Sequence, residues 1–192
     1  MKKIIMITII IGIIIILYSL ILTILFHNPI GCVFFVSGAF LFFSSLNYHL
    51  KNQSTIKLLQ TNKPRVLRLY LLFLAATILI EIAGRIILHL WVWPNFDTLE
   101  LILYVILIGY PISFFFYYEL FILIKKGTNM IASIITTTII AAIALELPNT
   151  FAWGWIYTIP YINLEILKVN IVVWLGWIIL IAIPLIANKI IK

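Results

Sequence analysis

Hydrophobic residues along this chain fall into six long runs, which short polar segments separate. The runs cover residues 4–26, 30–46, 66–90, 101–124, 130–147 and 171–187. A helix needs roughly 20 mostly apolar residues to cross a bilayer, and each run is about that long. The pattern therefore predicts an all-α fold, a polytopic membrane helix bundle with about six transmembrane helices. The first run is too long for the apolar core of a signal peptide, so we interpret it as the first membrane helix.

The polar segments divide one predicted membrane domain into four parts. Residues 1–46 form a helical hairpin, and residues 47–65 form a basic connector. Two further hairpins follow, over residues 66–126 and 127–192. The second apolar run is short, so we expect its helix to be partly interfacial. Proline disrupts a helix interior, and Pro148 is therefore predicted to end the fifth helix.

Composition excludes a soluble globule. The chain is 65% hydrophobic and 10% charged, with a mean hydropathy of +1.22, which leaves too little polar surface to cover an apolar core. The net charge of +7 belongs to residues at the ends of the apolar runs, so we expect no nucleic-acid partner. The single cysteine, Cys32, cannot form a disulfide within the chain.

The basic residues also predict an orientation. In a six-helix bundle, all but two of the 13 lysines and arginines fall on one side, and Arg85 and Lys168 are the exceptions. By the positive-inside rule that side is cytoplasmic. We therefore expect a multi-pass protein of the plasma membrane with both termini in the cytoplasm.

Two segments about 65 residues apart share one pattern. In each, a glutamate within an apolar run precedes a tryptophan-rich turn and a second acid. We interpret them as two parallel helix-hairpin repeats, which place both buried acids near the outer surface at one shared site. The matched pairs are Glu81 and Glu146, Trp91 and Trp155, Trp93 and Tyr157, and Glu100 and Glu165.

The third apolar run carries Glu81, Arg85 and His89 at four-residue spacing, which predicts a polar stripe on one face of an α-helix. An acid within hydrocarbon is costly and usually marks a functional site. Two interpretations stay open for the stripe. It is either a structural ion pair with the histidine at headgroup level, or the lining of a cavity in which Glu81 exchanges a proton.

Around the second acid, Asn149 follows Glu146 closely. We expect Asn149 either to cap the broken helix end or to join Glu146 and Glu81 in one pocket. Glu119 lies close to Lys125, so we expect its side chain to reach the cytoplasmic surface and to stay outside the site.

The predicted aromatic set consists of Trp91, Trp93, Trp155 and Tyr157. Aromatic residues gather at the membrane interface of most membrane proteins, and that explanation applies here too. The alternative is that these side chains form the walls of a substrate pocket. Aromatic faces stabilise a cation, and a neutral carboxylic acid can protonate a double bond.

Part of the chain resembles small membrane proteins of carotenoid biosynthesis. Residues 71–119 resemble a unit of the heterodimeric lycopene cyclase domain proteins, with Glu81 at the family's acid and Trp91-Val-Trp93 at its aromatic pair. Residues 146–177 are similar to the membrane carotenoid hydratases, in which an acid precedes Phe-x-x-x-Tyr-x-Tyr; here the segment reads Phe151-Ala-Trp-Gly-Trp155-Ile-Tyr157. Pro111 is followed by Ile-Ser-Phe-Phe, where the cyclase units carry Pro-x-Glu-Glu.

The resemblance implies a membrane protein that binds a carotenoid or other isoprenoid lipid, with cyclase-, hydratase- or isomerase-like chemistry. Glu81, Glu146, Arg85, His89 and Asn149 would be the acid–base residues, and the aromatic set would bind substrate. We expect no metal and no cofactor, because no metal-ligand spacing or phosphate-binding loop is present. A small transporter or channel and a non-catalytic membrane scaffold are the alternatives. Assembly into a homo-oligomer stays open.

Overall fold

The computed structural model describes residues 2–159, 162, 164–166 and 169–191. Within these residues, six helices are long and apolar enough to cross a membrane. They cover Lys3–Ile24, Ile30–Lys51, Lys63–Ile87, Thr98–Lys125, Met130–Ala152 and Ile171–Ile190. The all-α bundle predicted from the apolar runs is therefore confirmed, and the chain is a multi-pass membrane protein.

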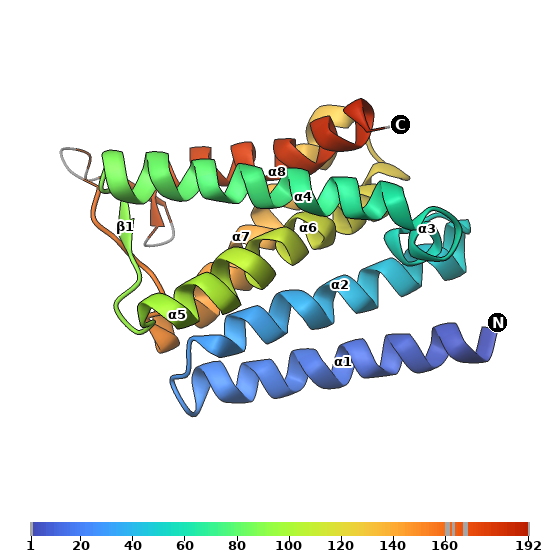
Figure 1. Cartoon of the computed structure of the whole chain (residues 1–192), viewed down its shortest axis with the longest axis horizontal. Coiled ribbons are helices and arrows are strands. Elements are labelled where there is room, and N and C mark those ends of the chain that lie inside the picture. The colour runs from blue at the N-terminus through green and yellow to red at the C-terminus, as the bar shows by residue number, and fades with distance from the viewer. Residues whose placement is uncertain (1, 160–161, 163, 167–168, 192) are drawn as a thin grey trace.

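The chain runs back and forth as a helical bundle (Figure 1). Two of the six membrane-crossing helices contain a π-helical part. The helical elements in order are α1(Lys2–Ile24), α2(Ile30–Lys51), α3(Thr55–Thr61), α4(Lys63–Ile80), the π-helix η1(Glu81–Ile87), α5(Thr98–Glu100), the π-helix η2(Leu101–Gly109), α6(Tyr110–Lys125), α7(Met130–Ala152) and α8(Ile171–Ile190). The short strands are β1(Trp91–Val92), β2(Ile156–Tyr157), β3(Glu165–Ile166) and β4(Val169–Asn170).

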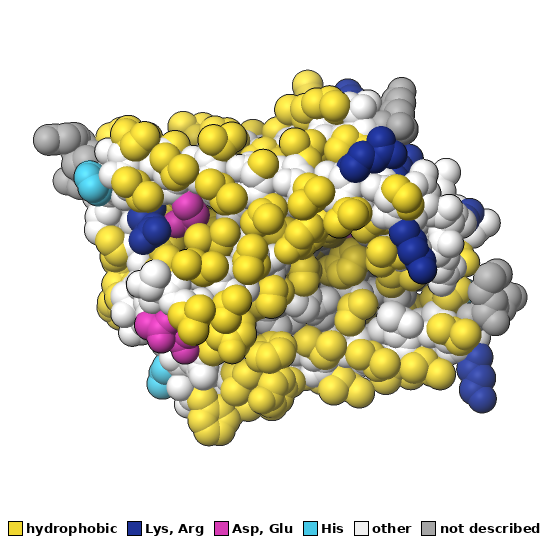
Figure 2. All heavy atoms as spheres, in the orientation of Figure 1, with side chains coloured by type: hydrophobic (Ala, Val, Ile, Leu, Met, Phe, Trp, Pro, Cys, Tyr) yellow, Lys and Arg dark blue, Asp and Glu magenta, His cyan; other side chains and the backbone are white. Residues whose placement is uncertain are grey.

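The bundle has two chemically different ends. Helices α2, α6 and α8 finish at the end that carries α3, and we call it the lysine end, after Lys51, Lys57, Lys125, Lys126 and Lys189. Figure 2 shows lysine and arginine side chains gathered mainly at that end. The opposite end carries β1 and β2, and we call it the aromatic end.

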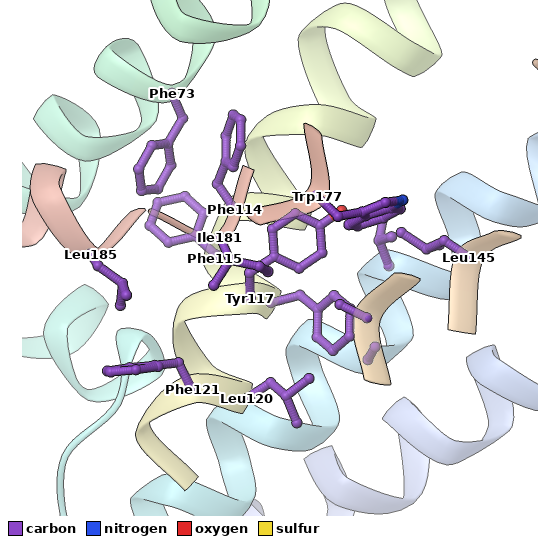
Figure 3. Close-up of a cluster of buried hydrophobic side chains, with 14 of the residues drawn as sticks. Phe73, Phe114, Phe115, Tyr117, Leu120, Phe121, Leu145, Trp177, Ile181 and Leu185 are labelled. Atoms are coloured by element: carbon purple, nitrogen blue, oxygen red, sulfur yellow. The ribbon is translucent and has the colours of Figure 1, made fainter. Parts of the chain in front are cut away.

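Helix α6 lies at the centre of the bundle and packs against α2, α4, α7 and α8. Its sequence is aromatic on nearly every side, which is typical of a helix that neighbours surround. Phe114 and Phe116 are fully buried, and the ring of Phe115 lies 4.9 Å from that of Phe73 on α4, centroid to centroid. Figure 3 shows how side chains from several helices meet around α6. This packing fixes the central helix that supplies Tyr110 to the site below.

Two predicted helix ends are wrong. Helix α2 is a full membrane helix that runs to Lys51 rather than a short interfacial one. Helix α7 continues through Pro148 and ends only at Ala152. A membrane helix tolerates proline where neighbouring groups satisfy the freed backbone. After the proline the helical hydrogen bonding resumes, since the amide of Trp153 donates to the carbonyl of Asn149 at 2.8 Å.

The expectation that Glu119 reaches the surface is also wrong. Its side chain is fully buried at the lysine end. The carboxylate accepts hydrogen bonds from the Thr55 amide at 2.5 Å, from Asn47 Nδ2 at 2.7 Å and from Ser44 Oγ at 3.1 Å. These donors belong to α2 and to the first residue of α3. Glu119 therefore ties the connector between α2 and α4 to the central helix.

Replacing Glu119 with leucine should destabilise the protein, because three buried donors would lose their acceptor. We expect Glu119→Leu to lower the free energy of unfolding by about 3 kcal/mol and Glu119→Gln by about 1 kcal/mol, since glutamine keeps one oxygen acceptor. Unfolding in mixed micelles measures both. The control is Glu165→Leu, which removes an exposed acid and should change stability by at most about 0.5 kcal/mol. Equal stability of the two leucine variants would contradict this role.

Candidate functional site

The two acid-containing segments meet at the aromatic end. Strand β1 pairs antiparallel with β2, which places Trp91 opposite Tyr157 and Val92 opposite Ile156. Just beyond the pairing, the rings of Trp93 and Trp155 lie 5.6 Å apart, centroid to centroid, edge to face. All four members of the predicted aromatic set therefore lie together.

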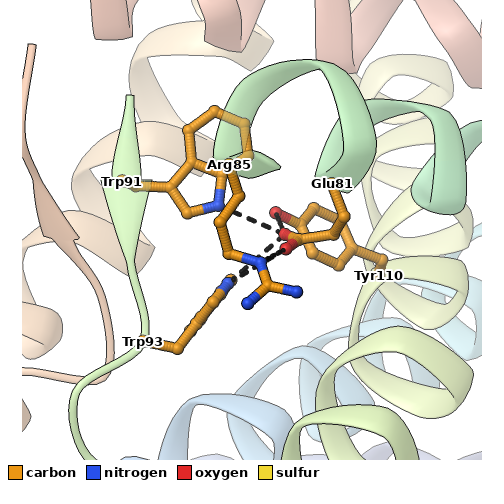
Figure 4. A network of polar contacts seen from close by, with 5 residues as sticks. All are labelled: Glu81, Arg85, Trp91, Trp93 and Tyr110. Atoms are coloured by element: carbon orange, nitrogen blue, oxygen red, sulfur yellow. Dashed lines mark hydrogen bonds and ion pairs between the residues drawn. The ribbon is translucent and has the colours of Figure 1, made fainter. Parts of the chain in front are cut away.

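Glu81 lies at the start of η1 and is 3% exposed. Arg85 Nε lies 2.9 Å from its Oε2, which makes an ion pair within one helix. Three aromatic donors complete the set around Oε1: Trp91 Nε1 at 3.2 Å, Trp93 Nε1 at 3.3 Å and the Tyr110 hydroxyl at 3.1 Å. Figure 4 shows these side chains converging on the carboxylate from β1, η1 and α6.

The local backbone explains how Trp91 reaches Glu81. The helix changes from α to π at Glu81, and π-helical turns are frequent at functional sites. The Trp91 ring lies directly over Gly84, where an added Cβ atom would be 1.8 Å from the ring. Only glycine leaves room for the indole at this position. Gly84 is therefore the residue that lets the ring fold back onto the carboxylate.

The predicted stripe of Glu81, Arg85 and His89 is only partly formed. Glu81 and Arg85 pair, but His89 lies beyond the end of η1 in a left-handed backbone conformation, with φ 51°. Its side chain is exposed, and its carbonyl accepts a hydrogen bond from Thr158 of the second segment. His89 is therefore not on one helix face with Glu81 and Arg85, because the helix ends at Ile87.

Glu146, on α7, is 7% exposed and has a similar set of donors. The Tyr157 hydroxyl donates to Oε1 at 2.5 Å, Trp177 Nε1 donates to the same oxygen at 2.9 Å, and Trp155 Nε1 donates to Oε2 at 3.2 Å. Each buried acid therefore accepts hydrogen bonds from two tryptophans and one tyrosine. Glu81 additionally pairs with Arg85. Among the residues that the structure describes, no lysine or arginine pairs with Glu146.

Asn149 positions one of these donors. Its Oδ1 accepts from the Trp155 amide at 3.1 Å, and its Nδ2 donates to the Trp155 carbonyl at 2.9 Å. The side chain thus holds the backbone of Trp155 on both sides while the indole points at Glu146. Burial raises the pKa of the Tyr157 phenol well above its ordinary value, and the neighbouring Glu146 carboxylate adds to this effect. Tyr157 therefore stays neutral and can donate its proton to the acid.

One cavity of about 430 Å³ joins the two groups of donors. All six aromatic donors line it, together with apolar residues of α2, η2, α7 and α8; the six are Trp91, Trp93, Tyr110, Trp155, Tyr157 and Trp177. The carboxylates themselves lie one layer behind these rings. Leu88, Leu175 and Ile179 also line the cavity and are more than half exposed, so the space reaches the surface that faces lipid.

Sequence reasoning did not find two of the six donors, Tyr110 and Trp177. They belong to other helices, 29 and 31 residues after their acids, and no local spacing links them to Glu81 or Glu146. One signal was available in the sequence. Each of the two residues follows a glycine, as Gly109-Tyr110 and Gly176-Trp177, at a similar distance after the acid in each segment.

Comparisons of the chain with protein-family models, with curated proteins and with solved structures found no match. The described residues contain no group of three or more His, Cys, Asp and Glu side chains that could hold a metal ion. The chemical groups of this arrangement are two carboxyl groups, six neutral aromatic donors, the Arg85 guanidinium and an apolar cavity.

A methyl group at Gly84 should displace the Trp91 ring. We expect Gly84→Ala to lower the free energy of unfolding by about 2 kcal/mol, since the ring and η1 cannot both keep their positions. Near-ultraviolet circular dichroism should also weaken, because the tryptophans lose their fixed packing. Gly176→Ala is the matched control, since no atom lies within 4 Å of the added Cβ there. A Gly84→Ala protein with unchanged stability and spectrum would refute the close packing.

Proposed function

We propose that this membrane protein binds the chain of an isoprenoid lipid, such as a carotenoid, in the cavity between its two buried acids. The single observation that carries the proposal is the cavity itself. Its volume of about 430 Å³ lies within the range of small-molecule sites, and its walls are mostly apolar with a few directed polar groups.

The opening toward lipid suits such a ligand. A polyene or polyprenyl chain dissolves in the bilayer and would enter sideways, past Leu88, Leu175 and Ile179. A ligand longer than the cavity could leave its remaining length in the surrounding hydrocarbon. Inside, the flat rings of six aromatic side chains offer faces for a conjugated chain, and the tyrosine hydroxyls offer the polar contacts.

We further propose that the protein converts the bound isoprenoid chain by acid–base chemistry. Glu81 and Glu146 would supply the carboxyl groups, the Tyr110 and Tyr157 hydroxyls would pass the proton on, and the tryptophan N–H groups would hold the carboxyl groups in place. Arg85 would hold the Glu81 carboxylate in position, and Asn149 would hold the backbone of Trp155 in place. The sequence resemblance to cyclase and hydratase proteins points to the same reaction types.

The orientation is also part of the proposal. The lysine end would lie in the cytoplasm by the positive-inside rule, with both termini inside and the aromatic end outside the plasma membrane. A ligand would then enter from the outer leaflet. The interpretation of residues 66–192 as two parallel repeats stays a prediction, and the similar donors of Glu81 and Glu146 support it.

Filling the cavity tests the binding proposal. Gly176 lines the cavity, and a Cβ atom added there meets no neighbouring atom within 4 Å, so Gly176→Phe is the variant chosen to place a ring in this space. In a host that accumulates lycopene, we expect the wild-type protein to copurify with pigment and Gly176→Phe to retain at least about ten times less, which is a loss of about 1.4 kcal/mol of binding. Absorbance of the detergent-purified protein measures the bound pigment.

The matched control is Ile186→Phe, on the lipid-facing side of the same helix, where 56% of the residue is exposed. It adds a similar ring and should retain pigment as the wild type does. Purified wild-type protein that carries no polyene or polyprenyl lipid, or equal retention by the two phenylalanine variants, would count against the proposal. Chromatography of total pigment from the same cells tests conversion, for which we expect a product that Glu146→Gln cells lack.

A further inference from the structure

A second cavity, of about 340 Å³, lies at the aromatic end beside the first. Its described lining comes from α7, β2, β3 and β4, and it is largely polar. The polar members are Glu146, Asn149, Thr150, Tyr157, Glu165 and Asn170. Glu165 is exposed, so this cavity borders the surface at the aromatic end. A polar space of this size holds water.

Tyr157 connects the two cavities. Its side chain belongs to the lining of both the apolar and the polar one. The Tyr157 hydroxyl donates to Glu146 Oε1 at 2.5 Å and accepts from Trp155 Nε1 at 3.1 Å. One hydrogen bond therefore connects a glutamate that lines the polar cavity with a tyrosine that lines the apolar cavity.

The two buried acids differ in this respect. Glu81 is paired with Arg85 and is not among the residues that line either cavity. Glu146 lines the polar cavity, and its three donors among the described residues are neutral. Exchange of a proton with water requires contact with a space that water can occupy, and the polar cavity supplies that space beside Glu146. Of the two acids, Glu146 is the one placed to exchange protons with water.

We propose that Glu146 and Tyr157 form a proton relay between water at the aromatic end and the apolar cavity. When Glu146 is protonated, the hydrogen bond between the two residues reverses, so that the carboxylic acid donates to the phenol oxygen. A proton that leaves the Tyr157 hydroxyl for a double-bond carbon or another basic atom of a cavity ligand is then replaced by the proton of the Glu146 carboxylic acid. Water in the polar cavity then reprotonates the Glu146 carboxylate. Removal of a proton from a ligand follows the same steps in reverse. The identity of the ligand in the apolar cavity rests on the proposed function, whereas the relay is a property of the ligand-free protein.

Other titratable groups surround this pair. Glu165 of β3 shares the polar cavity, and the side chains of Cys32 on α2 and of Tyr110 and Tyr117 on α6 lie close enough to interact electrostatically with Glu146. Lys168 falls outside the described residues. The experiment therefore has to separate the signal of Glu146 from those of the other buried acids, Glu81 and Glu119, and from the less buried acids of the aromatic end. All spectra are recorded in a background in which Asp97→Asn, Glu100→Gln and Glu165→Gln remove those less buried acids.

Infrared difference spectroscopy of ligand-free protein in vesicles tests the relay. Acidification at the aromatic end should produce the carbonyl band of a protonated carboxylic acid, and deuterated water on that side should shift the band. A cysteine introduced at Gly127, in the exposed turn between α6 and α7, reports which end faces outward when an impermeant reagent labels it. Acidification from the lysine end alone should leave the band unchanged.

Variants assign the band. We expect it to disappear in Glu146→Gln and to persist in Glu81→Gln and Glu119→Gln. In Tyr157→Phe the band should persist but change its wavenumber, because the carboxyl group loses its shortest hydrogen bond. If Glu146→Gln does not fold, the persistence of the band in the other two glutamine variants and its dependence on the acidified side still decide the question.

The relay is overturned if wild-type protein shows no acid-dependent carboxylic band from the aromatic end. It is also overturned if the band survives in Glu146→Gln, or if it vanishes in Glu81→Gln while folding is intact. The pigment-retention experiment fails or succeeds separately, because it measures occupation of the apolar cavity and not proton exchange.

Discussion

The cost of burying a carboxyl group in a membrane bundle organises the aromatic end of this structure. Glu81 and Glu146 are almost fully buried, and an unsatisfied carboxylate there would be far less stable than one in water. Each acid therefore needs several donors. The chain supplies them as indole and phenol groups, whose hydrophobic rings also pack well among apolar neighbours.

The choice of donor determines the shape of the site. A lysine or arginine cage would have filled the centre of the bundle with charge. Because aromatic donors are broad and rigid, they leave a space between the two acids that they cannot fill, and this space is the apolar cavity. The pairing of β1 with β2 then joins both groups of donors into one wall. At the lysine end, Glu119 meets the same requirement with small donors, Ser44, Asn47 and the Thr55 amide. No group of aromatic donors forms at the lysine end, and Glu119 instead connects α6 to α2 and α3 through hydrogen bonds.

The sequence predicted the parts of the structure that depend on local pattern. Six apolar runs of sufficient length predicted six membrane helices, since crossing hydrocarbon requires that length whatever the packing. Glu81, Glu146 and the aromatic set were also identified, because an acid in an apolar run is costly and the same aromatic pattern follows both acids. The structure brings the two segments together at the aromatic end, and their role as one functional site stays a prediction.

The remaining features depend on contacts between distant residues. Burial of Glu119 requires donors from a connector more than 60 residues away, and a nearby lysine suggested the opposite. Helix α7 passes through Pro148 because its surroundings tolerate the lost hydrogen bond, which propensity alone does not reveal. Neither acid lines the apolar cavity, because the aromatic rings lie between it and the carboxylates, and only the three-dimensional arrangement shows that order.

The central claim is that β1 and β2 bring the two acid-bearing segments together at one cavity, and a cross-link tests it most directly. Val92 lies opposite Ile156, and directly paired strand residues are close enough for a disulfide. With Cys32 replaced by serine, the account predicts that Val92→Cys and Ile156→Cys together form an intramolecular disulfide in membranes under mild oxidation. A cysteine at Val92 paired with one at Gly127, in the turn at the lysine end, should not form it. Equal cross-linking of both pairs, or none at Val92 and Ile156 in folded protein, would contradict the account.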